Sequence, residues 1–271
     1  MKTESTLMVN RTNGWRMGLS NLLGRENAKW WKSSRWWVQT LVWGLIINGI
    51  LVMLLFLIPF ITETFSGVNP DDLADIPDGI TVFFSMAGLA LPIGVVIILQ
   101  GSIISERELG TAEWILSKPV SRTAFFLSKL IAHSIGIFVT MNLIQTVLGF
   151  GFISVSQGEL ASLSGFVKGL GGISLLLFFY ITLTLMLDVI FDKRGVVLGV
   201  ALGAALGGAL LINLFPGLAL VTPFAFPNLI PLIVQGIEIP NFTLWLPFVS
   251  TLVMSLVFVF VAIKQFKRKA L

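Results

Sequence analysis

Six apolar runs, each about long enough to cross a lipid bilayer, limit what this chain can fold into. They cover residues 38–60, 80–104, 123–153, 168–191, 196–215 and 244–263. A helix needs roughly 20 apolar residues to cross the hydrocarbon core. Helices and closed barrels are the structures that satisfy every backbone polar group in lipid. The sequence therefore predicts an all-α integral membrane protein, in which six transmembrane helices form a single domain over residues 1–271.

The composition favours a membrane protein and excludes several kinds of site. Charged residues make up 12% of the chain, about half the share typical of soluble domains. Cysteine is absent and His133 is the single histidine, so disulfides and multi-histidine metal sites are excluded. We predict that His133 is a packed or interfacial residue, with a ligand or proton-relay role as the alternative. No metal or cofactor is expected in this chain.

The basic residues are sorted by side of the membrane. Of the 18 lysines and arginines, all but Lys168 fall in the N-terminal segment, in 105–129, at 193–194 or in the C-terminal tail. Short loops rich in lysine and arginine stay on the cytoplasmic side. We therefore expect both termini to be cytoplasmic, in the plasma (inner) membrane of a prokaryote. The same sorting explains the positive net charge without a nucleic-acid partner.

Three connecting segments have distinct characters. Residues 1–37 are basic and rich in tryptophan, and their apolar positions recur at helical spacing, which predicts an amphipathic helix at the lipid surface. Its alternative role is to pack beside a partner protein. Residues 61–79 form an acidic outer loop, either simply solvated or a docking site for an outer partner. Residues 216–243 contain five prolines, which predicts re-entrant or short outer helices before the last span.

Two features inside the apolar runs suggest helix packing. Asp188 would be costly against lipid, so we predict that it faces protein and pairs with a basic neighbour. Gly199, Gly203 and Gly207 recur at four-residue spacing. Small residues on one helix face let another helix approach closely, and this partner helix lies either in the same subunit or in another.

The polar stretch 105–122 separates the second and third runs. Ser105 and Glu108 have the spacing of a capping box, which predicts a helix start. Pro119 predicts the helix end, since the residue before proline avoids the helical region. Ser121 or Thr123 would then cap the third span. We predict a short amphipathic helix on the inner membrane surface; an ordinary inner loop is the alternative.

The same stretch resembles the inner-loop signature of permease subunits of ABC exporters of the type-two class. The matching residues are Glu106, Gly110, Thr111, Leu116, Ser117, Pro119, Val120, Ser121, Arg122 and Lys129, with Trp114 and Ile115 as departures. The resemblance implies a coupling helix docked on a separate ATP-binding-cassette ATPase, with two permease subunits (a homo- or heterodimer) and two ATPases, which hold ATP and Mg. The implied contact residues are Ser105, Glu106, Arg107, Glu108, Gly110, Thr111, Trp114, Leu116, Pro119 and Arg122.

The chain contains no element that would let it hydrolyse ATP itself. It has no G-x-x-x-x-G-K-[ST] phosphate loop, and we find no catalytic constellation, so we expect a non-catalytic subunit. The cargo is expected to be hydrophobic or amphipathic, with Asn48, Gln100, Asn142 and Gln145 as sparse polar residues along its path. The alternatives are a secondary transporter driven by an ion gradient and a non-transporting membrane scaffold.

Overall fold

The computed structural model describes residues 14–66 and 78–268. Within these ranges every regular element is a helix, so the predicted all-α class is confirmed. The first elements are α1 (Leu19–Trp31), α2 (Arg35–Trp43), η1 (Gly44–Asn48), α3 (Gly49–Val52), η2 (Met53–Leu57), α4 (Ile58–Ile61), η3 (Thr62–Ser66) and α5 (Gly79–Leu99). The others are α6 (Ile104–Glu108), α7 (Thr111–Leu116), α8 (Arg122–Ile137), η5 (Phe138–Leu143), α9 (Ile144–Gln157), α10 (Leu163–Ile190), α11 (Arg194–Leu214), η6 (Pro216–Leu220), η7 (Pro223–Ala225), α12 (Phe226–Val234) and α13 (Asn241–Arg268).

Five helical stretches are long and apolar enough to cross a membrane. They are Arg35–Thr64, Gly79–Glu108, Arg122–Gln157, Leu163–Ile190 and Leu244–Arg268. The sixth predicted run, 196–215, is part of α11, whose apolar portion Arg194–Gly208 belongs to the shorter class. The protein is thus a multi-pass membrane protein with five long apolar helices in its described part.

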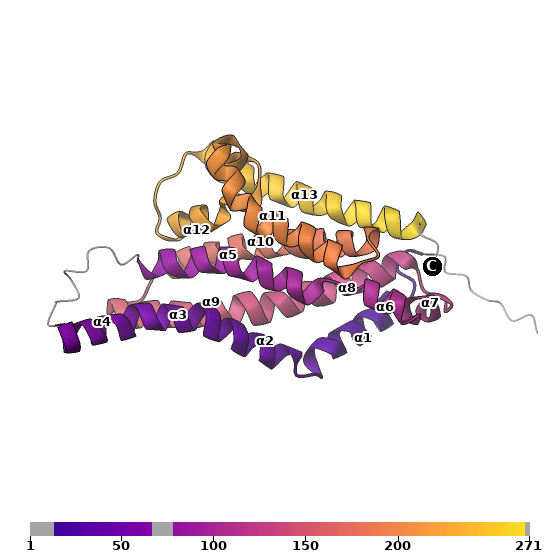
Figure 1. Cartoon of the computed structure of the whole chain (residues 1–271), viewed down its shortest axis with the longest axis horizontal. Helices are drawn as coiled ribbons and strands as arrows, with labels where there is room; N and C mark the ends of the chain where they lie inside the picture. The colour runs from indigo at the N-terminus through magenta and orange to yellow at the C-terminus, as the bar shows by residue number, and fades with distance from the viewer. Residues whose placement is uncertain (1–13, 67–77, 269–271) are drawn as a thin grey trace, which may run out of the picture.

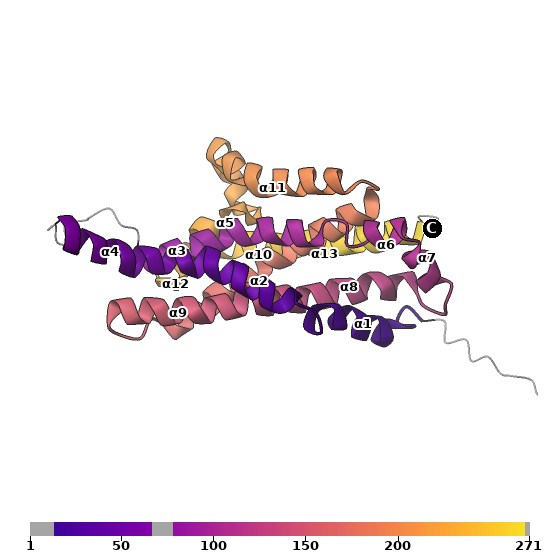
Figure 2. The same cartoon turned by 60° about the horizontal axis from the view of Figure 1, so that its bottom comes forward.

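The helices form an elongated bundle with α10 at its centre (Figures 1 and 2). The apolar window of α10 is 72% buried inside the protein, whereas the corresponding windows of the first and last long helices are each 22% buried. Helix α10 packs against α5, α12 and α13. Since a helix that is apolar all round needs apolar surroundings, the outer helices of the bundle present their remaining apolar faces to lipid.

Hydrogen bonds tie the described ends of the chain together at one end of the bundle, which we name the α7 end. The backbone N–H of Ser121 donates to the Met17 carbonyl (3.1 Å), and Arg122 Nη1 donates to the Phe266 carbonyl (3.2 Å). At the opposite end, the α12 end, Gln235 Nε2 donates to Asp78 Oδ2 (2.7 Å). The described chain therefore starts and finishes at the α7 end.

Residues 216–243 form short helices, as predicted. The elements η6, η7 and α12 are three to nine residues long. Helix α12 is buried through Phe226 and Ile230, and it approaches α5 so closely that a Cβ on Gly88 would lie 2.9 Å from Pro227 Cα. Whether these helices re-enter a membrane stays a prediction.

Several predicted boundaries move. The first long helix begins at Arg35, before the predicted start at 38, and it remains helical through η3, so the N-terminal part of the expected loop 61–79 is helix; residues 67–77 lie outside the described residues. Helix α10 begins at Leu163, which places Lys168 inside a helix. Helix α13 runs on to Arg268, five residues beyond the predicted end of the last span.

The predicted glycine stripe on α11 does not pack against the described part of the chain. A Cβ added at Gly199, Gly203 or Gly207 would meet no described atom within 4 Å, whereas one at Gly208 would lie 2.2 Å from the ring of Phe224. Of the two readings of the stripe, a partner helix in another subunit is the one that stays open.

Wide π-helical turns interrupt two neighbouring long helices at the same level. Gln145 Nε2 donates to the Thr140 and Thr40 carbonyls, both at 3.0 Å, and Asn48 Nδ2 donates to Gln145 Oε1 at 2.9 Å. The side-chain amide of Gln145 thus bonds a backbone carbonyl of each of the two helices. Asn48 and Gln145 therefore join these helices; their expected place along a cargo path stays a prediction.

Candidate functional site

The predicted helix at 105–122 is two short helices with a break at Gly110. Helix α6 ends at Glu108, α7 begins at Thr111, and Gly110 has φ +65°, a conformation that glycine adopts without steric cost. The predicted capping box is wrong, because α6 begins at Ile104 and the hydroxyl of Ser105 donates to the Gly101 carbonyl. The predicted cap of the third span is confirmed, since the Ala124 N–H donates to Ser121 Oγ (2.9 Å).

Three consecutive charged residues of α6 pair with three different parts of the bundle. Glu106 accepts from Lys29 Nζ of α1 at 2.7 Å. Arg107 Nη1 lies 2.9 Å from Asp192 Oδ1, in the connection between α10 and α11. Glu108 Oε2 lies 2.5 Å from Arg194 Nη2, at the start of α11. Helix α6 is thereby fixed on both sides.

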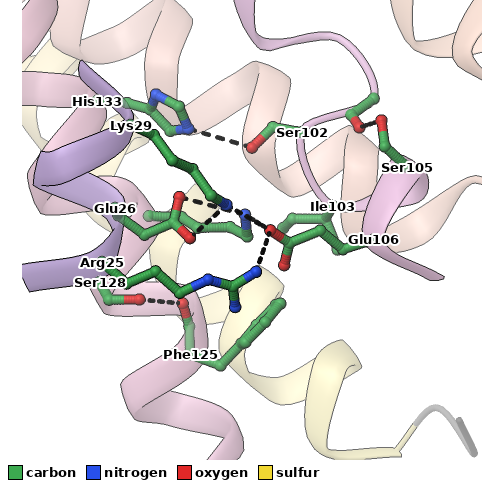
Figure 3. Close-up of polar contacts among 12 residues, drawn as sticks. Arg25, Glu26, Lys29, Ser102, Ile103, Ser105, Glu106, Phe125, Ser128 and His133 are labelled. Atoms are coloured by element: carbon green, nitrogen blue, oxygen red, sulfur yellow. Dashed lines mark hydrogen bonds and ion pairs between the residues drawn. The ribbon is translucent and has the colours of Figure 1, made fainter. Parts of the chain in front are cut away.

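Glu106 is the centre of a partly buried group of charges, which we name the Glu106 cluster: Arg25, Glu26, Lys29, Glu106 and Lys129. Figure 3 shows Arg25, Glu26 and Lys29 around Glu106. Lys129 Nζ lies 3.0 Å from Glu106 Oε1 and 3.6 Å from Glu26 Oε2. Lys29 Nζ lies 2.7 Å from both carboxylates, and Arg25 is 4.0 Å from Glu106. Because a buried charge needs a partner, the cluster holds α1, α6 and α8 together.

His133 lies beside the cluster and connects α1 to the turn before α6. Trp30 Nε1 donates to His133 Nδ1 (3.0 Å), and His133 Nε2 lies 3.2 Å from Ser102 Oγ. An indole N–H can only donate, so Nδ1 accepts and the ring proton is on Nε2, which donates to Ser102. His133 is 6% exposed, which confirms the packed interpretation. Among the described residues, no three His, Asp or Glu side chains gather as a metal site would require.

Asp188 fixes the turn between α5 and α6. Its carboxylate accepts from the N–H groups of Gly101 (2.8 Å) and Ile103 (2.5 Å), and it is fully buried. The prediction that Asp188 faces protein is confirmed. The expected basic partner of the carboxylate is wrong, because the carboxylate accepts from backbone amides. The nearby basic residue, Arg107, donates through Nη2 to the main-chain carbonyl of Asp188 (2.7 Å).

The residues from Leu109 to Pro119, which we name the tip, project from the α7 end of the bundle (Figure 1). Leu109 is 78% exposed and Trp114 is 61% exposed. Lys118 Nζ lies 3.6 Å above the Trp114 ring, a cation–π contact. A groove of about 490 Å³ separates the tip from α1. The tip therefore offers an aromatic and aliphatic surface with a basic neighbour.

The predicted contact residues differ in how accessible they are to a partner protein. Trp114 and Pro119 are exposed, whereas Glu106 is buried and Arg107 points into the bundle. Arg122 donates to backbone carbonyls in the last turn of α13. Glu108 is exposed but pairs with Arg194. The other predicted residues are partly buried: Ser105, Gly110, Thr111 and Leu116.

Sequence reasoning missed three participants. It did not single out Leu109, which lies next to the break at Gly110 and is exposed. It treated Glu26 and Lys29 as part of a lipid-surface helix. A carboxylate on the same helix face as buried Leu22 and Trp30 was the available signal for a protein partner.

The family of this chain follows from a match over most of its sequence. No curated protein matches the chain. Residues 41–271 match a family described as "Protein of unknown function (DUF2705)", and this range includes Glu106, Lys129 and Asp188 but not α1. Since the match covers well over half of the sequence, the chain belongs to the DUF2705 family.

Proposed function

We propose that this chain is the membrane-spanning permease subunit of an ATP-driven exporter of the ABC type, and that a separate ATPase subunit docks on the tip. The observation that carries the proposal is the pairing of Glu106, Arg107 and Glu108 with three different parts of the bundle. A push on the tip is transmitted through these pairs to α1, to the α10–α11 connection and to the start of α11. ATP binding and hydrolysis in the partner would in this way repack the spans.

The surface of the tip supports docking of a protein. An exposed tryptophan is typical of the anchors of protein interfaces. Trp114 lies outside the bundle together with Leu109, and Glu113 and Lys118 are exposed beside them. The basic residues of the described chain also gather at this end, which favours its cytoplasmic placement. An ATPase in the cytoplasm would meet the tip first.

The proposal includes a sixth crossing of the membrane. The described chain starts and finishes at the α7 end, so it must travel the length of the bundle an even number of times. Five long helices account for five passages. The consecutive elements α11, η6 and η7 together make the sixth passage. The open glycine face of α11 is available to a second permease subunit. The apolar composition favours a hydrophobic or amphipathic cargo.

The test is purification of the tagged chain from its native membrane with the ATPase it carries. We expect an ABC-type ATPase to co-purify with the wild-type chain. Leu109→Asp with Trp114→Asp should reduce the recovery of this ATPase about thirtyfold or more, because truncating a single hot-spot residue such as Trp114 costs roughly 2 kcal/mol or more. Leu160→Asp is the matched control, since Leu160 is 83% exposed but lies in the loop between α9 and α10.

Two outcomes would contradict the proposal. One is the absence of any ATP-binding-cassette protein from the purified wild-type complex. The other is equal recovery of the ATPase with the tip variants and with Leu160→Asp. Cargo movement that continues in ATP-depleted vesicles with an ion gradient would instead favour a secondary transporter, and partner binding without cargo movement would favour a scaffold.

A further inference from the structure

A polar pocket of about 330 Å³ lies beside the Glu106 cluster, between α1, α5, α6 and α8. The buried side chains of Lys129, His133 and Glu106 line its inner part, and Lys29 and Arg35 line it where the protein surface is exposed. The role proposed for the tip uses the ion pairs of this cluster but leaves the pocket itself without a function.

Basic residues around the pocket outnumber the acidic ones. Lys29, Lys129 and Arg35 line it together with Glu26 and Glu106. The two carboxylates are already paired with the two lysines at 2.7–3.6 Å. Arg35 takes no part in any ion pair with another residue of the described chain. The pocket thus carries one uncompensated positive charge at its exposed side, which an anion would balance.

Neighbouring aromatic residues place the pocket at the depth of lipid headgroups. Trp31, Trp36 and Trp37 are 39%, 41% and 46% exposed around the corner between α1 and α2, where Arg35 begins α2. Exposed tryptophans at the end of a membrane helix mark the headgroup layer. Ile98 of α5 lines the pocket and its neighbour Ile97 is 53% exposed. An apolar surface therefore adjoins the polar pocket.

A polar, positively charged pocket next to an exposed apolar helix suits an amphipathic anion. We propose that this pocket binds the phosphate of an anionic phospholipid, with Arg35 as the residue that attracts the headgroup and the acyl chains along α5. The bound lipid would contact α1, α6 and α8 at the Glu106 cluster. This proposal does not depend on the ATPase, and it holds or fails independently of the function proposed above.

The experiment is native mass spectrometry of the purified chain in micelles that contain phosphatidylglycerol and phosphatidylcholine in equal amounts. We expect the wild-type chain to retain one phosphatidylglycerol in preference to phosphatidylcholine. Arg35→Gln should reduce this preference about fivefold, the effect of losing one basic residue at an anionic lipid site. Arg35→Lys should keep most of it, because the charge is preserved.

Lys32→Gln is the matched control, since Lys32 is exposed, lies three residues before Arg35 and does not line the pocket. Its phosphatidylglycerol preference should equal that of the wild type. Equal retention of the two lipids by the wild-type chain, or equal losses in Arg35→Gln and Lys32→Gln, would overturn the proposal. Millimolar inorganic phosphate that displaces the lipid without any dependence on headgroup would also overturn it, because the pocket would then be a site for free phosphate.

Discussion

Lys129 shows how a single buried side chain can hold three helices. It is 2% exposed and lies between Glu106 of α6 and Glu26 of α1, while its own backbone belongs to α8. Removing one partner from a buried ion pair costs more than the pair is worth, because the remaining charge loses its compensation. Without Lys129, the cations left in the cluster would be Lys29 and Arg25, which are more exposed than Lys129.

We expect Lys129→Met to destabilise the protein by about 3 kcal/mol, the lower end of the cost of a broken buried pair. The measurement is thermal unfolding of the purified chain in detergent. Lys118→Met, at an exposed lysine of the tip, is the control and should leave the unfolding temperature unchanged. Adding Glu106→Gln to Lys129→Met should recover part of the loss; further destabilisation by the second change would contradict the assigned pairing.

At the scale of elements, α1 is a structural helix of the bundle. The sequence predicted an amphipathic helix at the lipid surface with a possible partner protein, and the structure gives that helix a partner within the chain. Trp30 is 1% exposed and lies over Gly136 of α8, where an added Cβ would be 2.5 Å from the indole ring. The contact requires the absence of a side chain at position 136.

Gly136→Val should therefore displace α1 while α8 stays helical. The measurement is limited trypsin digestion: cleavage after Arg25, Lys29 and Lys32 should become several-fold faster. Gly151→Val is the control, since Gly151 lies in the same long helical stretch and an added Cβ there meets no atom of the described residues within 4 Å. Equal cleavage of the two variants would show that α1 does not depend on this contact.

Hydropathy and proline positions were sufficient to predict the long helices and the broken segment 216–243, because those depend on local composition. The break at Gly110 and the partners of Glu106 were not predictable in the same way. Glu106 and Lys29 are 77 residues apart in the chain, and the choice among several nearby cations is made by how α1 packs on α8. Asp188 was predicted to face protein for a sound reason, the cost of a carboxylate in lipid, but its backbone partners depend on a turn that sequence patterns did not reveal.

For the whole molecule, the arrangement predicts which surfaces lie on opposite sides of a membrane. The chain contains no cysteine, so single cysteines can be introduced without a background. Ser117→Cys in the tip and Leu160→Cys between α9 and α10 are both at exposed positions. A membrane-impermeant maleimide should label Leu160→Cys in intact cells and Ser117→Cys in inverted vesicles. Labelling of both from the same side would contradict the proposed topology.

The pairing of Asp188 with the turn at Gly101 and Ile103 has a consequence for biosynthesis. The two amides that fix the corner between α5 and α6 receive their acceptor from a residue 85 to 87 positions later in the chain. A ribosome-bound chain that has not yet inserted α10 cannot complete this corner, because buried amides without an acceptor are costly. The direction in which α6 leaves α5 is therefore decided late, during insertion of a helix more than fifty residues downstream of it.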